Sequence, residues 1–570
     1  MPRIDDIVPD RATYRPGETA RISVTVSHEG HTAIQARLAL TLAHFTTAVE
    51  HATEAVRLEP DTRSVVRFAF TPPPTPLRGY GLDATLYSES GEVLAEGSGA
   101  LDVLERWSQA PRYGFLSDFA PDQSGIEERC DSMLRYHLNV VQFYDWMWRH
   151  YKLLPPSEEF TDGMGRRLSL ASVRAAIEGV QARGGAAMAY GAVYGAEPEF
   201  VQQHPELVLY DEAGERVSLA GLFYIMNIAP DSPWVPLIVE EFAEAVRVMG
   251  FDGIHLDQYG FPRTAFTASG EKVDLAQHFP LLIDRAREAV VAARQDTGVI
   301  FNAVENWPIE TVAPTSQDAV YIEVWPPDVS YNDLRRLIRE GRRLSGGKQV
   351  ILAAYLSTFL DTGEHSDPRT LWQAEAAALL ATATIAASGG SHLLLGERDG
   401  ILCDPYYPKY ATLRPASAAK LRAYYDFLVR YEELLISPEL EDWEPGTGAV
   451  AVRHSSRDVP TATQAEAGKI WTITRRAPGL HLVHLLNLTD QADVAWNALR
   501  TPPETLPDLD VSIDGLPPVR QVVLLAPGAA TGKPLPITWR QEAGNLQFSL
   551  PQLSVWAVVA CVLEADQTWG

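Results

Sequence analysis

The feature that most limits the possible folds is an alternation of short apolar runs with helical patterns between about residues 110 and 438. Helix-like stretches such as 172–183, 235–249 and 281–294 lie between the runs. The runs are apolar on both faces, as strands covered by helices must be. Eight strand-then-helix units in roughly 330 residues are the number and length of a (β/α)8 barrel. The predicted strands are 112–118, 139–145, 186–193, 253–258, 299–305, 319–325, 349–356 and 392–397.

The sequences on either side of this region have a different pattern. Short alternating runs such as 20–26, 36–42 and 63–70 are separated by turns that contain Pro and Gly, which is typical of a small immunoglobulin-like sandwich. The C-terminal part also has strand-like runs with Pro-rich turns, which predicts a second antiparallel β-sandwich. Neither junction has a long Gly/Ser linker, so we expect the parts to pack as one body. The predicted multidomain α/β plus all-β fold has an immunoglobulin-like β domain at 1–107, a (β/α)8 TIM barrel at 108–438 and a β-sandwich domain at 439–570.

Charge and composition argue against several classes of function. The chain has 48 Lys and Arg against 74 Asp and Glu, a formal net charge of −26. A surface that acidic repels nucleic-acid phosphates and anionic membranes, so neither is an expected partner. The longest apolar run, at 376–387, is shorter than the roughly 20 residues of a membrane span. The first residues do not resemble a secretory leader, so we expect a cytoplasmic protein, or a secreted one if a leader was removed.

The sequence has no signature of a metal or nucleotide cofactor. Its three cysteines, Cys130, Cys403 and Cys561, are far apart. An odd and sparse number argues against a disulfide framework, and no CxxC or Cys/His cluster offers a zinc site. No GxGxxG follows a strand, and no phosphate loop occurs. We therefore expect no cofactor and no metal.

Acidic residues stand at the ends of six of the eight predicted strands. Catalytic groups of a barrel gather at these ends, where Ser and Cys are scarce in this chain. Carboxylates facing aromatic residues suggest acid/base chemistry on a sugar, because glycoside hydrolysis needs one carboxyl group to protonate the leaving oxygen and another to attack the anomeric carbon or activate water. Each acid could instead cap a helix or pair with an arginine. The strand-end acids are Asp118, Asp145, Asp257, Glu305, Glu323 and Glu397, the last followed by Asp399 and Asp404.

Aromatic and amide residues cluster beside these carboxylates in the sequence. Sugars present apolar C–H faces that stack on rings, and their hydroxyls need hydrogen-bonding partners. Ordinary packing between loops and helices is the alternative role for each ring. The long segment 194–234, rich in aromatic residues and Pro, is expected to carry substrate contacts. The candidate sugar-binding residues, besides the acids, are Tyr144, Trp146, Tyr194, Asn227, Gln258, Tyr259 and Trp325.

The most informative segment is FDGIHLDQYG at 251–260. Asp252 precedes the strand, where we expect a structural hydrogen bond, and Gly253 permits close backbone packing. Asp257 stands at the exit of the strand, and its next two neighbours are polar or amphipathic, as expected of a site rather than a core. The apolar pattern alone does not make Asp257 a nucleophile.

Five segments carry a resemblance to a known family: NVVQFYDWMWRHYKLLPP (139–156), YIMNIAPDSPWV (224–235), GFDGIHLDQYG (250–260), YIEVWPP (321–327) and SHLLLGERDGILCDPYYPKY (391–410). Together and in this order they resemble glycoside hydrolase family 66, the family of the endo-dextranases and the cycloisomaltooligosaccharide glucanotransferases. The resemblance covers about 110–410 by motif. Outside that range it rests on the order of an immunoglobulin-like domain, a barrel and a β-sandwich.

The resemblance implies a retaining mechanism on α-1,6-linked glucan, with dextran or isomaltooligosaccharides as neutral substrates. It places the nucleophile on Asp257, the general acid/base on Glu323 and a sugar-contacting carboxylate on Asp145. The glucanotransferases carry a carbohydrate-binding module inserted in the barrel region. No segment of that size is present here, which favours the hydrolase.

The sequence leaves other interpretations open. A transglycosylase that makes cyclic or longer isomaltooligosaccharides would use the same residues. A non-catalytic carbohydrate-binding barrel would not need both carboxylates, and both are present. A hydrolase of different linkage specificity, such as an α-galactosidase-like enzyme, is another alternative. Within the site, Glu305 is the strongest rival of Glu323 for the acid role.

Overall fold

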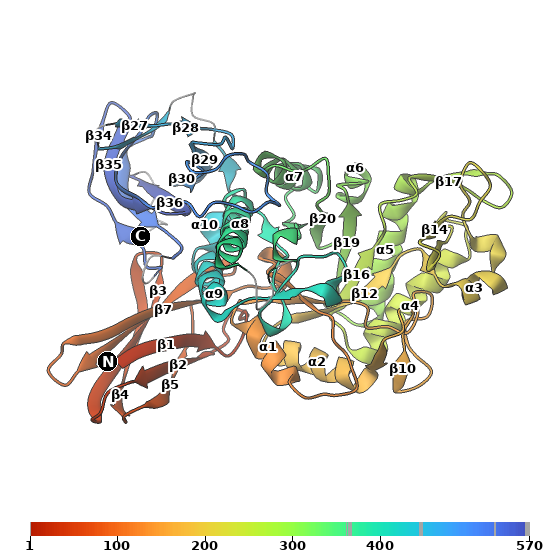
Figure 1. Ribbon diagram of the computed structural model, residues 1–570, viewed down its shortest axis with the longest axis horizontal. Helices are drawn as coiled ribbons and strands as arrows, with labels where there is room; N and C mark the ends of the chain where they lie inside the picture. Colours follow the sequence, from red (N-terminus) through yellow and green to blue (C-terminus); the bar gives the residue numbers. More distant parts are fainter. Residues whose placement is uncertain are drawn as a thin grey trace.

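Eight parallel strands form one sheet at the centre of the computed structural model (Figure 1). The structure describes residues 2–360, 362, 367–443, 449–455, 457–528 and 532–564. Each of the eight predicted strand positions overlaps one of these strands, although the eighth shares only His392 with it. The order along the sheet is β22 (Ser391–His392), β21 (Val350–Ala353), β20 (Ala319–Glu323), β19 (Gly298–Val304), β16 (Gly253–Asp257), β12 (Ala186–Ala192), β9 (Val140–Phe143) and β8 (Tyr113–Leu116).

The first and last strands are joined by a parallel bridge between Phe115 and Gly396. A Cβ atom at position 396 would lie 2.5 Å from the carbonyl oxygen of Phe115, so this approach requires glycine. The eighth strand is shorter than the predicted 392–397, because Leu394, Leu395 and Gly396 pair with the chain that follows them, residues 400–402. The sheet is therefore a nearly closed barrel.

Two glycines bring neighbouring strands together at the opposite end of the barrel. A Cβ at Gly253 would lie 2.1 Å from the carbonyl oxygen of Gly298, which confirms the close packing predicted for Gly253. The carboxylate of Asp252 accepts hydrogen bonds from the Ala187 N–H and the Gln181 amide, both at 2.9 Å, which confirms its structural role.

Helices surround the barrel, and several begin at a capping side chain. Ser169, Asp274 and Ser330 each accept a hydrogen bond from a backbone N–H of the first turn that follows. No helix in the described part of the chain is long and apolar enough to cross a membrane. The helices are α1 (Ile126–Leu134), α2 (Leu170–Ala182), α3 (Pro198–Gln203), α4 (Trp234–Met249), α5 (Leu275–Ala293), α6 (Ile309–Val312), α7 (Tyr331–Leu344), α8 (Pro368–Ala387), α9 (Pro415–Arg430) and α10 (Glu432–Ile436).

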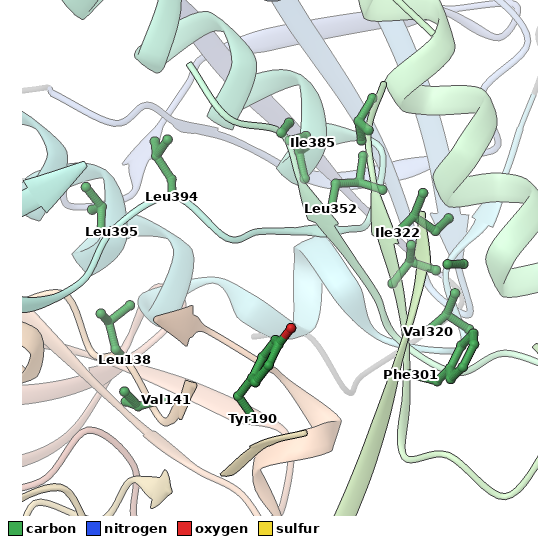
Figure 2. Packing of buried hydrophobic residues seen from close by; sticks show 14 of the residues in the cluster. Leu138, Val141, Tyr190, Phe301, Val320, Ile322, Leu352, Ile385, Leu394 and Leu395 are labelled. Carbon is green, nitrogen blue, oxygen red and sulfur yellow. The ribbon is translucent and has the colours of Figure 1, made fainter. Parts of the chain in front are cut away.

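The main apolar core lies between the strands and these helices. Figure 2 shows Phe301, Val320, Ile322 and Leu352, which come from three neighbouring strands and are almost completely buried. Burying each such side chain contributes about 1.5–3 kcal/mol. A second apolar cluster, which includes Met188 of β12, contains inward-facing residues of the barrel itself. Because this interior is packed, a ligand can enter only at an end of the barrel.

Short hairpins extend the loops of the barrel. They lie in the second, third, fourth and eighth strand-to-helix connections, and the one in the third connection belongs to the long segment 194–234. These strands are β10 (Glu159–Thr161), β11 (Arg167–Ser169), β13 (Gly195–Ala196), β14 (Ser218–Leu219), β15 (Phe223–Ile225), β17 (Thr264–Phe266), β18 (Lys272–Asp274), β23 (Gly400–Ile401) and β24 (Ala411–Thr412).

Two antiparallel sheets precede the barrel and share one apolar cluster, which includes Val24, Leu40, Phe70 and Leu82. This cluster is separate from the barrel core. One sheet has the order β1 (Pro2–Pro9), β2 (Ala20–His28) and β5 (Thr62–Phe70), and the other has β4 (Thr47–Leu58), β3 (Ile34–His44), β6 (Arg78–Ser88) and β7 (Val93–Val103).

Two further antiparallel sheets follow the barrel and share a cluster that includes Val452, Leu485, Val511 and Val559. One has the order β25 (Glu441–Asp442), β29 (Ile470–Ala477), β30 (Leu480–Asn487), β36 (Trp556–Leu563), β32 (Val519–Leu525) and β33 (Leu535–Pro536), with β28 (Thr461–Ala462) beside β29. The other has β27 (Arg457–Val459), β26 (Val450–His454), β31 (Leu506–Ile513), β35 (Asn545–Leu553) and β34 (Trp539–Glu542).

Buried charges join the N-terminal sheets to the barrel. The Arg112 guanidinium lies 2.7 Å from a carboxylate oxygen of Asp102 on β7 and 3.1 Å from one of Glu432 on α10. All three side chains are less than a tenth exposed. In Figure 1 the N-terminal and C-terminal sheets lie on the same side of the barrel, and Lys533 contacts Glu96 between them at 3.0 Å.

A loop of the C-terminal part, residues 490–500, is attached to the strand-to-helix connections of the barrel. The Trp496 indole donates to the carbonyl of Asp328 at 2.8 Å, and its backbone N–H donates to the carbonyl of Val329 at 3.0 Å. The backbone N–H of Arg500 donates to the carbonyl of Gln373 at the start of α8. The C-terminal part therefore holds the sixth connection and the helix that follows the seventh strand.

Candidate active site

A cavity of about 760 Å³ opens where the barrel strands end, within the size range of ligand pockets. The residues that follow or end β9, β16, β19 and β20 line it, so this is the C-terminal face of the barrel. Among described residues no group of three or more His, Cys, Asp or Glu is arranged to hold a metal ion. The sequence-predicted site residues that line the cavity are Tyr144, Asp145, Asp257, Gln258, Tyr259, Glu305, Glu323 and Trp325.

One amide joins the two central carboxyl groups. Asp257 ends β16 and Glu323 ends β20, and Asn302 lies on β19 between them. The Asn302 nitrogen donates to Oδ1 of Asp257 at 2.8 Å and to Oε2 of Glu323 at 2.7 Å. The two carboxylate oxygens are therefore no more than about 5.5 Å apart. The Tyr190 hydroxyl donates to the other oxygen of Asp257 at 2.7 Å.

The two acids have different environments. Burial raises the pKa of Asp257 to about 6, and hydrogen bonds from Asn302 and Tyr190 oppose that rise. Burial and then the charge of Asp257 raise the pKa of Glu323 to about 7, against hydrogen bonds that include those of Asn302 and Trp325. At pH values between these two pKa values, Asp257 is mostly ionised while Glu323 mostly keeps its proton. Such a separation suits one carboxylate acting as a nucleophile and one carboxyl group acting as an acid.

Asp145 lies in the same cavity in a strained backbone conformation. Its φ of 49° is in the left-handed region, which costs a non-glycine residue about 1–3 kcal/mol and is common at functional sites. Arg166 donates to the carbonyl of Asp145 at 2.7 Å, and its guanidinium is 3.6 Å from the carboxylate. Burial raises the pKa of Asp145, while His150 and Arg166 lower it.

Glu305 lies at the edge of the cavity rather than between the two central acids. Its side chain is 45% exposed and accepts from Arg263 at 3.2 Å. Its backbone N–H donates to the carbonyl of Glu323 at 3.0 Å. Glu305 is held by Arg263 at the exposed edge, whereas Glu323 shares the Asn302 amide with Asp257, so the geometry favours Glu323 as the acid.

Aromatic rings form one wall of the cavity. Tyr144 stacks on Tyr407 with ring centres 4.3 Å apart, and Tyr407 also contacts Tyr355. Trp325 is half-buried and packs against Tyr355. These rings present faces and hydroxyl groups on which a sugar could stack and bind.

Gln258 and Tyr259 line the cavity but also hold the local backbone. The Gln258 amide donates to the carbonyls of Asn302 and Trp307, both at 3.2 Å, and its oxygen accepts from the Gly260 N–H at 2.6 Å. The Tyr259 hydroxyl is buried and has no hydrogen-bonding partner within the described ranges.

Two aromatic candidates lie outside the cavity lining. Trp146 is completely buried and donates through its indole to the carbonyl of Tyr190 at 3.2 Å. Tyr194 is also completely buried, donates to the carbonyl of Phe261 at 2.9 Å and accepts from the Tyr259 N–H at 2.7 Å. Both residues support the loops behind the site instead of facing it. Their motif positions are next to the site in sequence, but their side chains point into the core.

Four polar candidates also make structural contacts away from the cavity. Glu397 is completely buried, accepts from Ser117 and pairs with Arg129 at 2.9 Å. Asp118 pairs with Arg398 at 3.0 Å. Asn227 accepts from the Ala229 N–H at 3.0 Å, and Asp404 accepts from the Tyr406 N–H at 2.8 Å, so each side chain caps its own turn.

The expected substrate loop, 194–234, does reach the cavity. Its hairpin β14–β15 brings Leu219, Leu222 and Phe223 to the lining, and Leu222 is 46% exposed. Met164 of the second connection also lines the cavity. This side of the cavity is apolar, opposite in character to the carboxylates.

Several residues at the centre of the site were not among the sequence candidates. Asn302 and Tyr190 hold Asp257, while Tyr355 and Tyr407 line the ring wall. For Asn302 and Tyr190 the signal in the sequence is a polar side chain inside an otherwise apolar strand, as in VIFNAVE and AAMAYGAV. Such a residue must find a hydrogen-bonding partner, and at the exit of a barrel strand that partner is a site residue.

Comparison with known proteins gives consistent matches. The model of the family described as Glycosyl hydrolase family 66 matches residues 9–560. A cycloisomaltooligosaccharide glucanotransferase from Niallia circulans is 22% identical, with 98% of this chain and 72% of that protein covered. A dextranase from Streptococcus salivarius is 23% identical, with 72% of this chain and 56% of that protein covered.

A solved structure shares the fold. The cycloisomaltooligosaccharide glucanotransferase of Paenibacillus sp., complexed with cycloisomaltoheptaose, superposes with a TM-score of 0.90. The alignment covers 98% of this chain and all of that chain, at 22% identity. A likeness at this identity shows a shared fold and nothing more.

Proposed function

This chain belongs to glycosyl hydrolase family 66, and from its cavity we propose that it hydrolyses α-1,6-glucosidic linkages in dextran or isomaltooligosaccharides through a covalent glycosyl-enzyme intermediate. The observation that carries the proposal is the facing pair Asp257 and Glu323, held by one amide with oxygens no more than about 5.5 Å apart. Retaining glycosidases hold their carboxyl groups roughly 5–5.5 Å apart, whereas inverting ones need about 6.5–9.5 Å.

In the first step, a carboxylate oxygen of Asp257 attacks the anomeric carbon as Glu323 protonates the departing glycosidic oxygen. The bond to that oxygen breaks, and a β-linked glycosyl ester forms on Asp257. In the second step, Glu323 takes a proton from water, which attacks the same carbon and releases a sugar with the original α configuration. The proton that Glu323 gave is thereby restored.

The remaining lining residues supply sugar contacts in this proposal. Asp145 accepts hydrogen bonds from sugar hydroxyls near the reacting bond, with its carboxylate fixed by Arg166. Tyr144 and Trp325 offer ring faces to the C–H faces of glucosyl units. Leu222 and its neighbours on the β14–β15 hairpin bound the opposite side of the chain.

The same carboxyl pair would also support transglycosylation, the activity in the name of the Niallia circulans relative. The product depends on whether water or a sugar hydroxyl reaches the intermediate first. We favour hydrolysis because the inserted carbohydrate-binding module expected of a glucanotransferase is missing from the barrel region of this sequence.

Product analysis tests the proposal. The protein is incubated with dextran, isomaltooligosaccharides, other α-glucans and galactosides, and the first product is followed by proton NMR. We expect linear isomaltooligosaccharides with the α-anomer formed first, from α-1,6-glucans alone. Cyclic products would favour the transglycosylase, a first β-anomer would exclude the retaining mechanism, and cleavage of galactosides would change the assigned substrate.

We also propose a division into three domains at about 107 and 438, with an immunoglobulin-like fold for the first. Its support is the separate apolar cluster of each pair of sheets and the two-sheet order of the first seven strands. Limited proteolysis should cut slowly at both junctions, because buried ion pairs and the 490–500 loop cross them. Rapid release of a folded 110–438 fragment would contradict this packing.

A further inference from the structure

The orientation of the Asn302 amide is fixed by its partners. Carboxylate oxygens only accept hydrogen bonds when ionised, and an amide donates only through its nitrogen. Asp257 is the ionised member of the pair, and its oxygen lies 2.8 Å from one atom of this amide, so that atom is the nitrogen. An oxygen of Glu323 lies 2.7 Å from the same atom. Both of its N–H groups are used, one for each central acid.

This orientation leaves the other end of the amide without a partner. The Asn302 side-chain oxygen is buried and accepts no hydrogen bond from any described residue. An unsatisfied buried acceptor lowers stability, so its presence calls for a reason other than stability. The residue lines the cavity but is only 3% exposed.

The amide also sets a distance. Its two N–H bonds diverge by about 120°, so oxygens bonded at these lengths lie about 5 Å apart. Asn302 stands on β19, which pairs with β16 on one side and β20 on the other. The three groups therefore come from three adjacent strands of a packed barrel, and their spacing does not depend on a mobile loop.

We propose that Asn302 is the positioning residue of this pair, whose single amide nitrogen fixes the separation of nucleophile and acid/base. The inference rests on the proposed function of Asp257 and Glu323. In this proposal the role of Asn302 is to hold the two acids and not to bind the sugar. It holds both carboxyl groups on the same rigid donor, so that each reaches its own atom of the glycosidic bond.

Loss of this donor has a specific consequence for proton binding. The hydrogen bonds from Asn302 lower the pKa of both acids, so removing them raises both. The other groups that act on the pair stay in place in an Asn302 variant. They are Tyr190, the Gln258 N–H and Asp145 beside Asp257, and Trp325, Tyr355, Tyr321 and Tyr407 beside Glu323.

The test compares Asn302→Ala and Asn302→Asp with the matched control Asn306→Ala. Asn306 lies in the same strand-to-helix unit, also has an unpaired buried side-chain oxygen, and donates to Glu340 outside the cavity. For each protein, kcat and KM on isomaltooligosaccharides are measured from pH 4 to 9, and folding is checked by Tm.

For Asn302→Ala we expect kcat to fall at least ~10-fold with KM little changed. Both limbs of the pH profile should move upward by about one pH unit, the size expected for losing a hydrogen bond to a charged group. Asn302→Asp should be less active still, because it adds a third carboxyl group. The control should keep the wild-type profile.

An Asn302→Ala protein with an unchanged pH profile, or one whose loss lies entirely in KM, would overturn the positioning role while leaving the proposed function intact. A loss of kcat that the control shows equally would also overturn it, because the effect would then be structural. A wild-type protein inactive on every α-glucan would refute the proposed function and the positioning role together.

Discussion

Replacing Glu323 by Gln should make the protein more stable at alkaline pH although it impairs turnover. The folded-state pKa of Glu323 is about 7, against an ordinary value of 4.5. Below pH 4.5 the group is protonated in both the folded and the unfolded chain, so its ionisation does not lower the free energy of unfolding. Between 4.5 and 7 the unfolded chain releases its proton while the folded protein keeps it, so the free energy of unfolding falls as pH rises.

The magnitude follows from the two pKa values. They differ by about 2.5, and one pKa unit is worth 1.36 kcal/mol, so above pH 7 the buried carboxylate costs about 3 kcal/mol. The side chain is only 9% exposed, so solvent screens little of this cost. A glutamine cannot ionise, so the variant avoids this loss of stability. Asp257, whose pKa is raised from 3.8 to about 6, also makes the free energy of unfolding fall as pH rises, and this fall occurs in both proteins.

The assay is thermal unfolding of wild type and Glu323→Gln at pH values from 4 to 9. The difference in Tm between variant and wild type should grow in favour of the variant from pH 4.5 to 7 and then level off. Glu305→Gln is the matched control, because that side chain lines the same cavity but is 45% exposed. A Tm difference that stays constant over the whole range, or one that the control reproduces, would refute the reasoning.

Three further predictions concern the site and its support. Asp257→Ala should lower kcat at least about 10⁴-fold with Tm retained. On an activated aryl isomaltooligosaccharide, azide should restore turnover by Asp257→Ala through one displacement, with a β-glycosyl azide as the product. It should restore turnover by Glu323→Ala through two displacements, with an α-glycosyl azide as the product. Rescue of Glu305→Ala instead of Glu323→Ala would reverse the assignment of the acid. Trp325→Ala should raise KM on isomaltooligosaccharides more than it lowers Tm, and an unchanged KM with a large loss of Tm would show that the ring is part of the core. Arg112→Met should destabilise the protein by about 3–5 kcal/mol in denaturant unfolding, because it removes the cation that pairs with the buried acidic side chains of Asp102 and Glu432. A loss below about 1 kcal/mol would contradict the importance of these contacts.

The barrel could be predicted from sequence because its strands are apolar on both faces. This pattern can be recognised in the sequence without knowing which residues are in contact. Asp257 and Glu323 were among six candidate acids because they stand where such strands end, and the resemblance to the family singled them out. The eighth strand was predicted too long, since the pairing of Leu394 with Leu402 depends on a hairpin rather than on composition. Long-range pairing of this kind leaves no periodic signal in the chain.

The direction of a side chain decides whether it faces the cavity, and proximity in sequence does not predict that direction. Trp146 and Tyr194 stand next to site residues in sequence but are turned into the core, and burial of that kind follows from tertiary packing. Asn302 was the opposite case, an inward-facing polar residue inside an apolar strand. Its importance becomes visible only when strands β16 and β20 are placed on either side of it.

The attachment of the 490–500 loop to the barrel bears on how such a chain can change over generations. Trp496 holds the backbone of Asp328, whose own N–H is bonded to the carbonyl of Trp325 in the cavity wall. A recombination event that exchanged the C-terminal β region for an unrelated one would remove that support and disturb the cavity three residues away. We therefore expect the C-terminal region to be inherited with the barrel as one unit.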